Sequence, residues 1–190
     1  MRDRLRPKGR TIRFNPPEVS TTKRLCKSID VDASIGEVWK AWTTAKGASR
    51  FFAPSARIEL EVGGPYEPLF DLDSPAGLQG GEGLQVLGYV PNETLSFTWN
   101  APPHFPSIRR NYHTWVVLQF EPLSRNRTRV RLDHLGWGKG GDWPKVYSYF
   151  DRAWDLVLWR LAERFNRGPI DWDEPYSPPK GWSASVCEQR

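Results

Sequence analysis

The longest regular pattern of apolar positions runs from about residue 142 to residue 167. Apolar side chains recur there every three or four residues, and charged side chains occupy other faces. The recurring positions are Val146, Phe150, Trp154, Val157, Leu158, Leu161 and Phe165. Asp142 is a candidate N-cap, Pro144 suits the first turn, and Gly168 is a stop signal. The pattern predicts one long helix with an aromatic stripe.

Before this helix, apolar and polar residues alternate along short segments, as in strands with one buried face. The pattern predicts strands at residues 23–31, 57–62, 66–72, 84–90, 95–99, 114–121 and 128–135. In the last segment, Arg127, Arg129 and Arg131 share the solvated face, where they are expected to discourage aggregation. Residues 101–111 contain three prolines and are predicted to form a loop.

Two short helices are predicted after the first strand. Ser34 and Glu37 have the spacing of a capping box, and Gly47 is a natural stop. A second short turn is expected at residues 49–52. Strands in succession with segregated helices indicate an α+β domain in which the long helix lies across an antiparallel sheet.

The chain has 190 residues, enough for one domain with extensions. We expect a basic N-terminal arm at residues 1–22, the domain at 23–167, and a proline- and aromatic-rich tail at 168–190 that packs back onto the domain or a partner. Nine of the Lys and Arg residues fall within residues 1–27, although the whole chain carries only +5. Residues 28–167 sum to zero charge, and no nucleic-acid partner is predicted.

No apolar run approaches the roughly 20 residues of a membrane helix, and no signal peptide is visible. Integral membrane association is therefore not expected, and a cytoplasmic location is. Cys26 and Cys187 are the two cysteines. Their separation gives neither a disulfide framework nor a metal-ligand spacing, and free thiols are favoured over a clasp between the two ends.

Several segments together resemble a known family. They are residues 31–44 (VDASIGEVWKAWTT), 51–54 (FFAP), the Gly63-Gly64 turn, 87–99 (LGYVPNETLSFTW) and 128–136 (TRVRLDHLG). In this order they are similar to the activator of Hsp90 ATPase homologue 1-like proteins of the SRPBCC, START or Bet v 1-like superfamily. The resemblance implies a helix-grip fold with a central cavity. It does not fix one function, because this fold hosts many. The eukaryotic co-chaperone has a separate N-terminal domain that 22 residues cannot form, so an Hsp90 partnership is not expected.

Ten tryptophans provide large apolar side chains for a pocket or for the core itself. Both readings stay open, because such residues stabilise a fold without any guest. The predicted ligand-binding residues are Trp42, Phe52, Ile58, Tyr66, Trp99, Leu118, Leu132, His134, Phe150, Trp154 and Leu158. His134 and Tyr66 would be the polar groups of this pocket. A hydrogen-bonded core histidine is the other reading of His134.

The leading hypothesis is a protein that binds a small hydrophobic ligand, lipid-like or aromatic, between the sheet and the last helix. One alternative is a cyclase- or hydrolase-like enzyme with His134 or Tyr147 as acid or base. Another is an interaction module related to the Hsp90 activator. No residue spacing nominates a catalytic nucleophile, a metal site or a cofactor site. The sequence also allows a homodimer.

Overall fold

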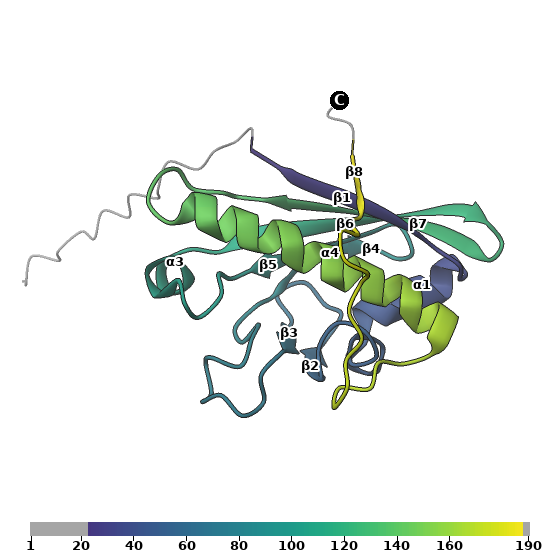
Figure 1. Cartoon of the computed structure of the whole chain (residues 1–190), viewed down its shortest axis with the longest axis horizontal. Helices are drawn as coiled ribbons and strands as arrows, with labels where there is room; N and C mark the ends of the chain where they lie inside the picture. The colour runs from purple at the N-terminus through teal and green to yellow at the C-terminus, as the bar shows by residue number, and fades with distance from the viewer. Residues whose placement is uncertain (1–22, 188–190) are drawn as a thin grey trace, which may run out of the picture.

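The protein is described here by a computed structural model of residues 23–187. An antiparallel sheet of six strands, ordered β4-β5-β6-β7-β1-β8, is crossed by the long helix α4 (Figure 1). The α+β helix-grip prediction is confirmed. The elements are β1 (Leu25–Val31), α1 (Ile35–Thr43), α2 (Ala45–Ala48), β2 (Ser55–Ile58), β3 (Tyr66–Leu69), β4 (Val86–Val90), β5 (Thr94–Trp99), α3 (Pro106–Asn111), β6 (Thr114–Ser124), β7 (Arg127–Leu135), α4 (Trp143–Arg167) and β8 (Ser185–Val186).

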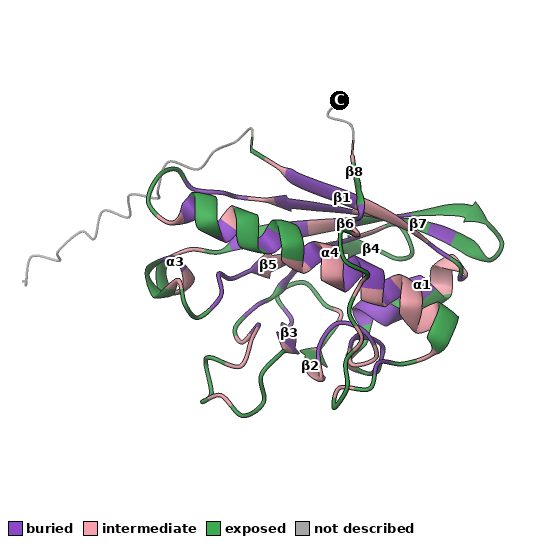
Figure 2. Cartoon of the chain, in the orientation of Figure 1, coloured by how far each residue is buried: buried purple, intermediate pink, exposed green. Residues whose placement is uncertain are grey.

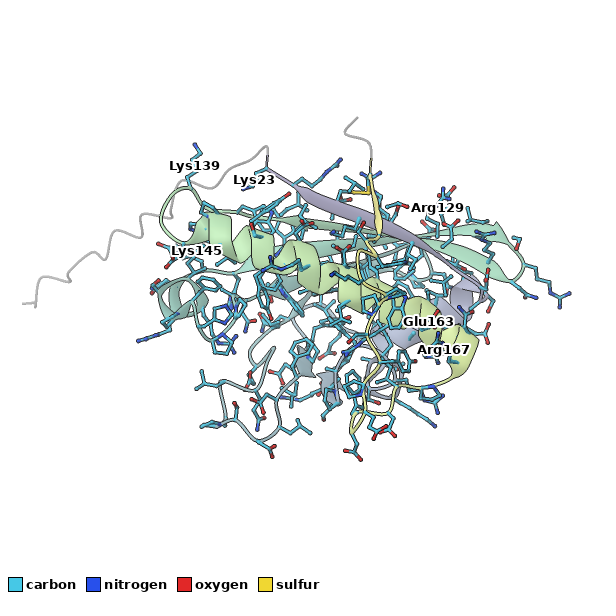
Figure 3. All side chains as sticks on the ribbon, viewed as in Figure 1. Lys23, Arg129, Lys139, Lys145, Glu163 and Arg167 are labelled. Carbon is cyan, nitrogen blue, oxygen red and sulfur yellow. A yellow bond between two sulfur atoms is a disulfide. The ribbon has the colours of Figure 1, made fainter. Side chains whose placement is uncertain are left out.

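The sheet has one buried and one wet face, as its alternating residues require. On β7, Thr128, Val130 and Leu132 are buried, whereas the arginines between them face outward. Arg129 projects from the side of the sheet away from α4 (Figure 3). Its Nε lies 2.7 Å from Oδ1 of Asp30 on the neighbouring β1. The hydrogen bond from Arg129 lowers the pKa of the Asp30 carboxyl.

Helix α4 starts and ends where its sequence signals place it. Pro144 lies in the first turn, and Gly168 ends the helix with φ at 99°. Asp142 precedes the helix, but its carboxylate accepts a hydrogen bond from Lys145 Nζ at 2.9 Å and does not cap the backbone. Buried and exposed residues alternate around the helix, because one stripe faces the sheet (Figure 2).

A buried ion-pair network ties α4 to β1. Lys27 is 3% exposed, and its Nζ lies 2.7 Å from Asp155 and 2.8 Å from Asp151. Two carboxylates offset the cost of burying the ammonium group. The predicted capping box at the start of α1 is present, with the Ser34 N–H donating to Glu37 Oε2 at 3.1 Å.

The connection between β3 and β4 differs from the prediction. Strands expected at 57–62 and 66–72 end early and form a separate two-stranded sheet, β2–β3. The carboxylate of Glu82 accepts backbone N–H bonds from Gly77, Gln79 and Gly80 at 2.7–2.8 Å. These bonds hold the chain in a compact loop around one side chain, so the strand cannot continue. The expected loop at 101–111 also contains a helix, α3, which has Pro106 in its first turn.

The expectation of free thiols is wrong, because Cys26 and Cys187 form a disulfide. The tail returns to the sheet and pairs as β8 with Lys27 and Ser28 of β1, which brings the two Cα atoms to 5.4 Å (Figure 3). This separation suits a disulfide. Such bonds are typical of oxidising compartments, and the cytoplasmic location stays a prediction.

The tail packs onto the domain, which is one of the two outcomes expected for it. The indole N–H of Trp172 donates to the Ser49 carbonyl at 2.7 Å, and the Ala184 N–H donates to Asp155 Oδ1 at 3.0 Å. The tail thereby crosses α4 on the way to β1 (Figure 1). The basic arm at 1–22 lies outside the described residues, and the proposed domain boundaries stay predictions.

The double variant Cys26→Ser/Cys187→Ser is expected to lose about 2–4 kcal/mol of unfolding free energy, because the bond closes a very long loop and restricts the unfolded chain. Urea unfolding of oxidised wild type and the variant measures this loss. Counting alkylated cysteines without reductant is the control. Two alkylated cysteines in the folded protein would contradict the disulfide.

Candidate functional site

Ten of the eleven predicted ligand-binding residues are buried beneath α4, and Ile58 is partly buried. Their rings touch one another. The Phe52 ring centroid lies 5.2 Å from that of Trp42, 5.8 Å from Trp99 and 6.0 Å from Trp154. Tyr66 stacks on Phe97 at 4.0 Å. These side chains pack against one another in the centre of the fold, so they act there as core.

His134 lies at the centre of a buried hydrogen-bond chain that joins α4 to three strands. The indole N–H of Trp154 donates to His134 Nδ1 at 3.0 Å. Since Nδ1 accepts, Nε2 carries the proton and donates to Thr114 Oγ1 at 2.7 Å. The Thr114 hydroxyl in turn donates to the carbonyl of Trp99 at 3.1 Å. Every polar atom of the imidazole ring therefore has a partner within the protein.

Burial explains the electrostatics of both predicted polar groups. His134 is fully buried, and the loss of solvation lowers its pKa well below 6.5, so the ring is neutral. Burial raises the pKa of the Tyr66 phenol, whose O–H donates to the Trp42 carbonyl at 3.1 Å. Neither group is free to contact a ligand without breaking an internal bond.

A cavity lies beside α4, on the flank that faces β3 and the end of β5. Its volume is about 190 Å³. Four predicted residues line it, namely Phe52, Trp99, Phe150 and Trp154; the other seven do not. The remaining lining residues are Phe70, Tyr149, Ala153, Leu156, Val157 and Arg160.

The mouth of this cavity carries exposed apolar side chains. Phe70 is 42% exposed and Tyr149 is 37% exposed, and both line the cavity and a neighbouring groove. Leu78, 45% exposed, lies in the same groove. Clustered exposed rings cost solvation free energy in a free protein and mark a surface that contacts something apolar.

The loops around this groove are held by Glu82 and Arg109, which sequence reasoning missed. The Arg109 guanidinium donates to the carbonyls of Ala101, Gly77 and Gly80 at 2.8–3.0 Å and lies 3.4 Å from Glu82. Together the two residues fasten the loop before β4 to the loop after β5. The groove walls are therefore fixed by specific polar contacts.

Four lining residues on α4 were also missed. Tyr149, Ala153, Leu156 and Arg160 follow one another at spacings of three or four residues and form a second stripe along the flank. The sequence shows this spacing, but the four side chains are not all apolar, so the stripe does not stand out as a buried face. The apolar pattern alone favours the central stripe.

Two of the lining residues carry nitrogen groups. The indole N–H of Trp99 is buried away from solvent and has no hydrogen-bond partner among the described residues. Arg160 is partly buried, and its Nε donates to the carbonyl of Tyr176 in the tail at 3.3 Å. Its guanidinium carbon lies 5.4 Å from the ring centroid of Trp172. Burial lowers the pKa of this guanidinium.

A larger hollow of about 700 Å³ lies against the outer face of the sheet and the tail. Both of its arginines are already paired: Arg129 with Asp30 in the hollow, and Arg131 with Asp133 beside it. Such paired groups give the hollow little chemistry to offer a ligand. The flank cavity is the better candidate site, since it combines exposed rings with the partly buried Arg160.

The long helix across an antiparallel sheet places the protein in the helix-grip class. The family model for activator of Hsp90 ATPase homolog 1-like proteins matches residues 32–166. The chain therefore belongs to this family. A search of curated proteins found no match. Across residues 23–187, no helix has both the length and the apolar character that a membrane span requires.

Solved structures show the same fold. Protein MLL2253 from Mesorhizobium loti has a TM-score of 0.61 at 19% identity, over 78% of this chain and 100% of that one. The Aha1 dimer from Colwellia psychrerythraea has a TM-score of 0.58 at 22% identity, over 77% and 98%. DynU16, from the dynemicin biosynthetic locus, has a TM-score of 0.57 at 18% identity, over 77% and 48%.

His134 makes a pH-dependent contribution to stability. Its folded-state pKa lies below the unfolded value of 6.5. Below that pH, the unfolded chain binds a proton that the folded protein does not, so stability falls by up to about 1.4 kcal/mol per pH unit. Urea unfolding between pH 5 and pH 7 is expected to show this slope in wild type and a shallower one in His134→Gln.

The control is His104→Gln, which removes an exposed histidine and is expected to keep the steep dependence. Parallel stability curves for wild type and His134→Gln would contradict the assignment.

Proposed function

We propose that the protein binds a small aromatic molecule in the flank cavity beside α4. The observation that carries this proposal is the cluster of exposed rings, Phe70 and Tyr149, at the mouth of an apolar cavity. The family's fold commonly binds ligands, which supports the same reading. The ligand lies on the flank of the helix and contacts Phe52, Trp99 and Trp154 at the inner wall.

The size of the cavity favours one aromatic ring over a long acyl chain. A volume of about 190 Å³ is slightly larger than an engineered cavity of about 150 Å³ that accepts benzene. A ring with a short side chain fills this space, and the side chain extends toward the mouth. The lipid-like ligand of the original hypothesis would have to lie mostly outside it.

The two alternative functions have less support. For an enzyme, His134 already uses both ring nitrogens inside the core, and the Tyr147 hydroxyl donates to the Arg24 carbonyl at 3.3 Å. Tyr147 also does not line the flank cavity. For an Hsp90 activator module, the family name is the supporting observation. The ATPase rate of an Hsp90 at saturating protein tests that reading.

Ala153→Phe is expected to abolish binding, because a ring at this position fills the cavity from the α4 side. Wild type is expected to bind 3-phenylpropan-1-ol or 3-phenylpropionate with a dissociation constant of about 0.1–1 mM. Calorimetry measures the affinity, and quenching of Trp fluorescence reports occupancy next to Trp99 and Trp154.

The matched control is Arg152→Phe, which adds the same ring one residue earlier, at an exposed position of α4. This variant is expected to bind like wild type. Binding that survives in Ala153→Phe, or the absence of binding by wild type to either compound, contradicts the proposed site.

We also propose a homodimer through the edge strand β4. One similar structure is a dimer, and Leu87 and Val90 on β4 are 47% and 48% exposed. Open edge strands with apolar side chains favour pairing with another chain. Light scattering is expected to give twice the monomer mass for wild type and the monomer mass for Leu87→Lys/Val90→Lys. A monomeric wild type contradicts the proposal.

A further inference from the structure

The flank cavity has an uneven distribution of polarity along α4. Aromatic side chains gather at one end, around Phe52, Trp99 and Trp154, whereas Arg160 stands at the other. Six residues, or about 9 Å of helix, separate Trp154 from Arg160. A ligand that matched this arrangement would have an apolar ring and, a few bonds away, a group that pairs with a guanidinium.

The guanidinium of Arg160 has polar and aromatic contacts but no carboxylate partner among the described residues. Within residues 23–187, its Nε donates to the Tyr176 carbonyl, which uses one of five N–H donors, and its guanidinium carbon lies 5.4 Å from the ring centroid of Trp172. A partly buried cation without a counter-charge is costly.

We infer that the ligand carries a carboxylate and that Arg160 binds it. This inference rests on the proposed function and names the class of its ligand, an aromatic acid with a short side chain. The planar guanidinium matches a carboxylate with paired N–H bonds. The ring of Trp99 lines the aromatic end of the cavity. The ring of the ligand packs against the aromatic end.

The experiment compares two probes with the same ring and chain length but different end groups, the carboxylate of 3-phenylpropionate and the hydroxyl of 3-phenylpropan-1-ol. Wild type is expected to bind the acid at least about tenfold more tightly, as a charge-assisted hydrogen bond implies. In Arg160→Gln this preference is expected to disappear, because the affinity for the acid falls to that for the alcohol. A urea unfolding midpoint like that of wild type shows that the variant still folds. Arg160→Lys, which keeps the charge, is expected to retain part of the preference.

Arg164→Gln is the matched control. Arg164 is also a partly buried arginine of α4, but it lines a different groove. This variant is expected to keep the preference for the acid. If Arg164→Gln and Arg160→Gln lose the preference for the acid equally, the assignment of carboxylate binding to Arg160 is overturned.

The outcomes separate this inference from the proposed function. If wild type binds both probes equally, the carboxylate inference is overturned and the aromatic site stands. If wild type binds neither probe, the proposed function fails, and the inference fails with it.

Discussion

The fold depends on the buried hydrogen-bond chain through His134. The imidazole accepts from Trp154 on α4 and donates to Thr114 on β6, and Thr114 donates to Trp99 at the end of β5. These donors and acceptors all have their partners only when α4 lies in this one position against the sheet. A shift of α4 would leave buried polar atoms without partners, at a cost of about 1–3 kcal/mol each. This hydrogen-bond chain therefore fixes the distance between α4 and the sheet, and the surrounding rings pack at that distance.

This constraint decides where a ligand has room. With α4 held against the sheet by His134 at the centre and by Lys27 at β1, the aromatic side chains fill the space beneath the helix. The opening moves to the flank, where β3 is short and the loop around Glu82 replaces a longer strand. The core and the cavity thus share Phe52, Trp99 and Trp154. Each of these rings packs against other rings of the core and also lines the cavity.

Local patterns allowed most of the fold to be predicted. Residues close together in the sequence determine α4, the capping box of α1 and the alternating strands β5 to β7. The spacing of apolar and polar residues reveals such local structure. The early end of β3 depends on Glu82, a side chain more than ten residues away, and β8 depends on a pairing across most of the chain. The site was predicted in part, since the central aromatic stripe reaches the cavity. The flank stripe was not recognised, because Ala153 and Arg160 are not apolar markers of a buried face.

The tail connects the disulfide to the candidate site. Cys187 holds the end of the tail against β1, and further back the same segment places Tyr176 and Trp172 around Arg160. The carbonyl of Tyr176 and the ring of Trp172 restrict the guanidinium, so that fewer rotamers remain to be lost on binding. A guanidinium that is already ordered binds a carboxylate at a smaller entropic cost than a free one. The tail therefore supports the site through Arg160 without lining the cavity, and the bond between Cys26 and Cys187 fixes the far end of the tail.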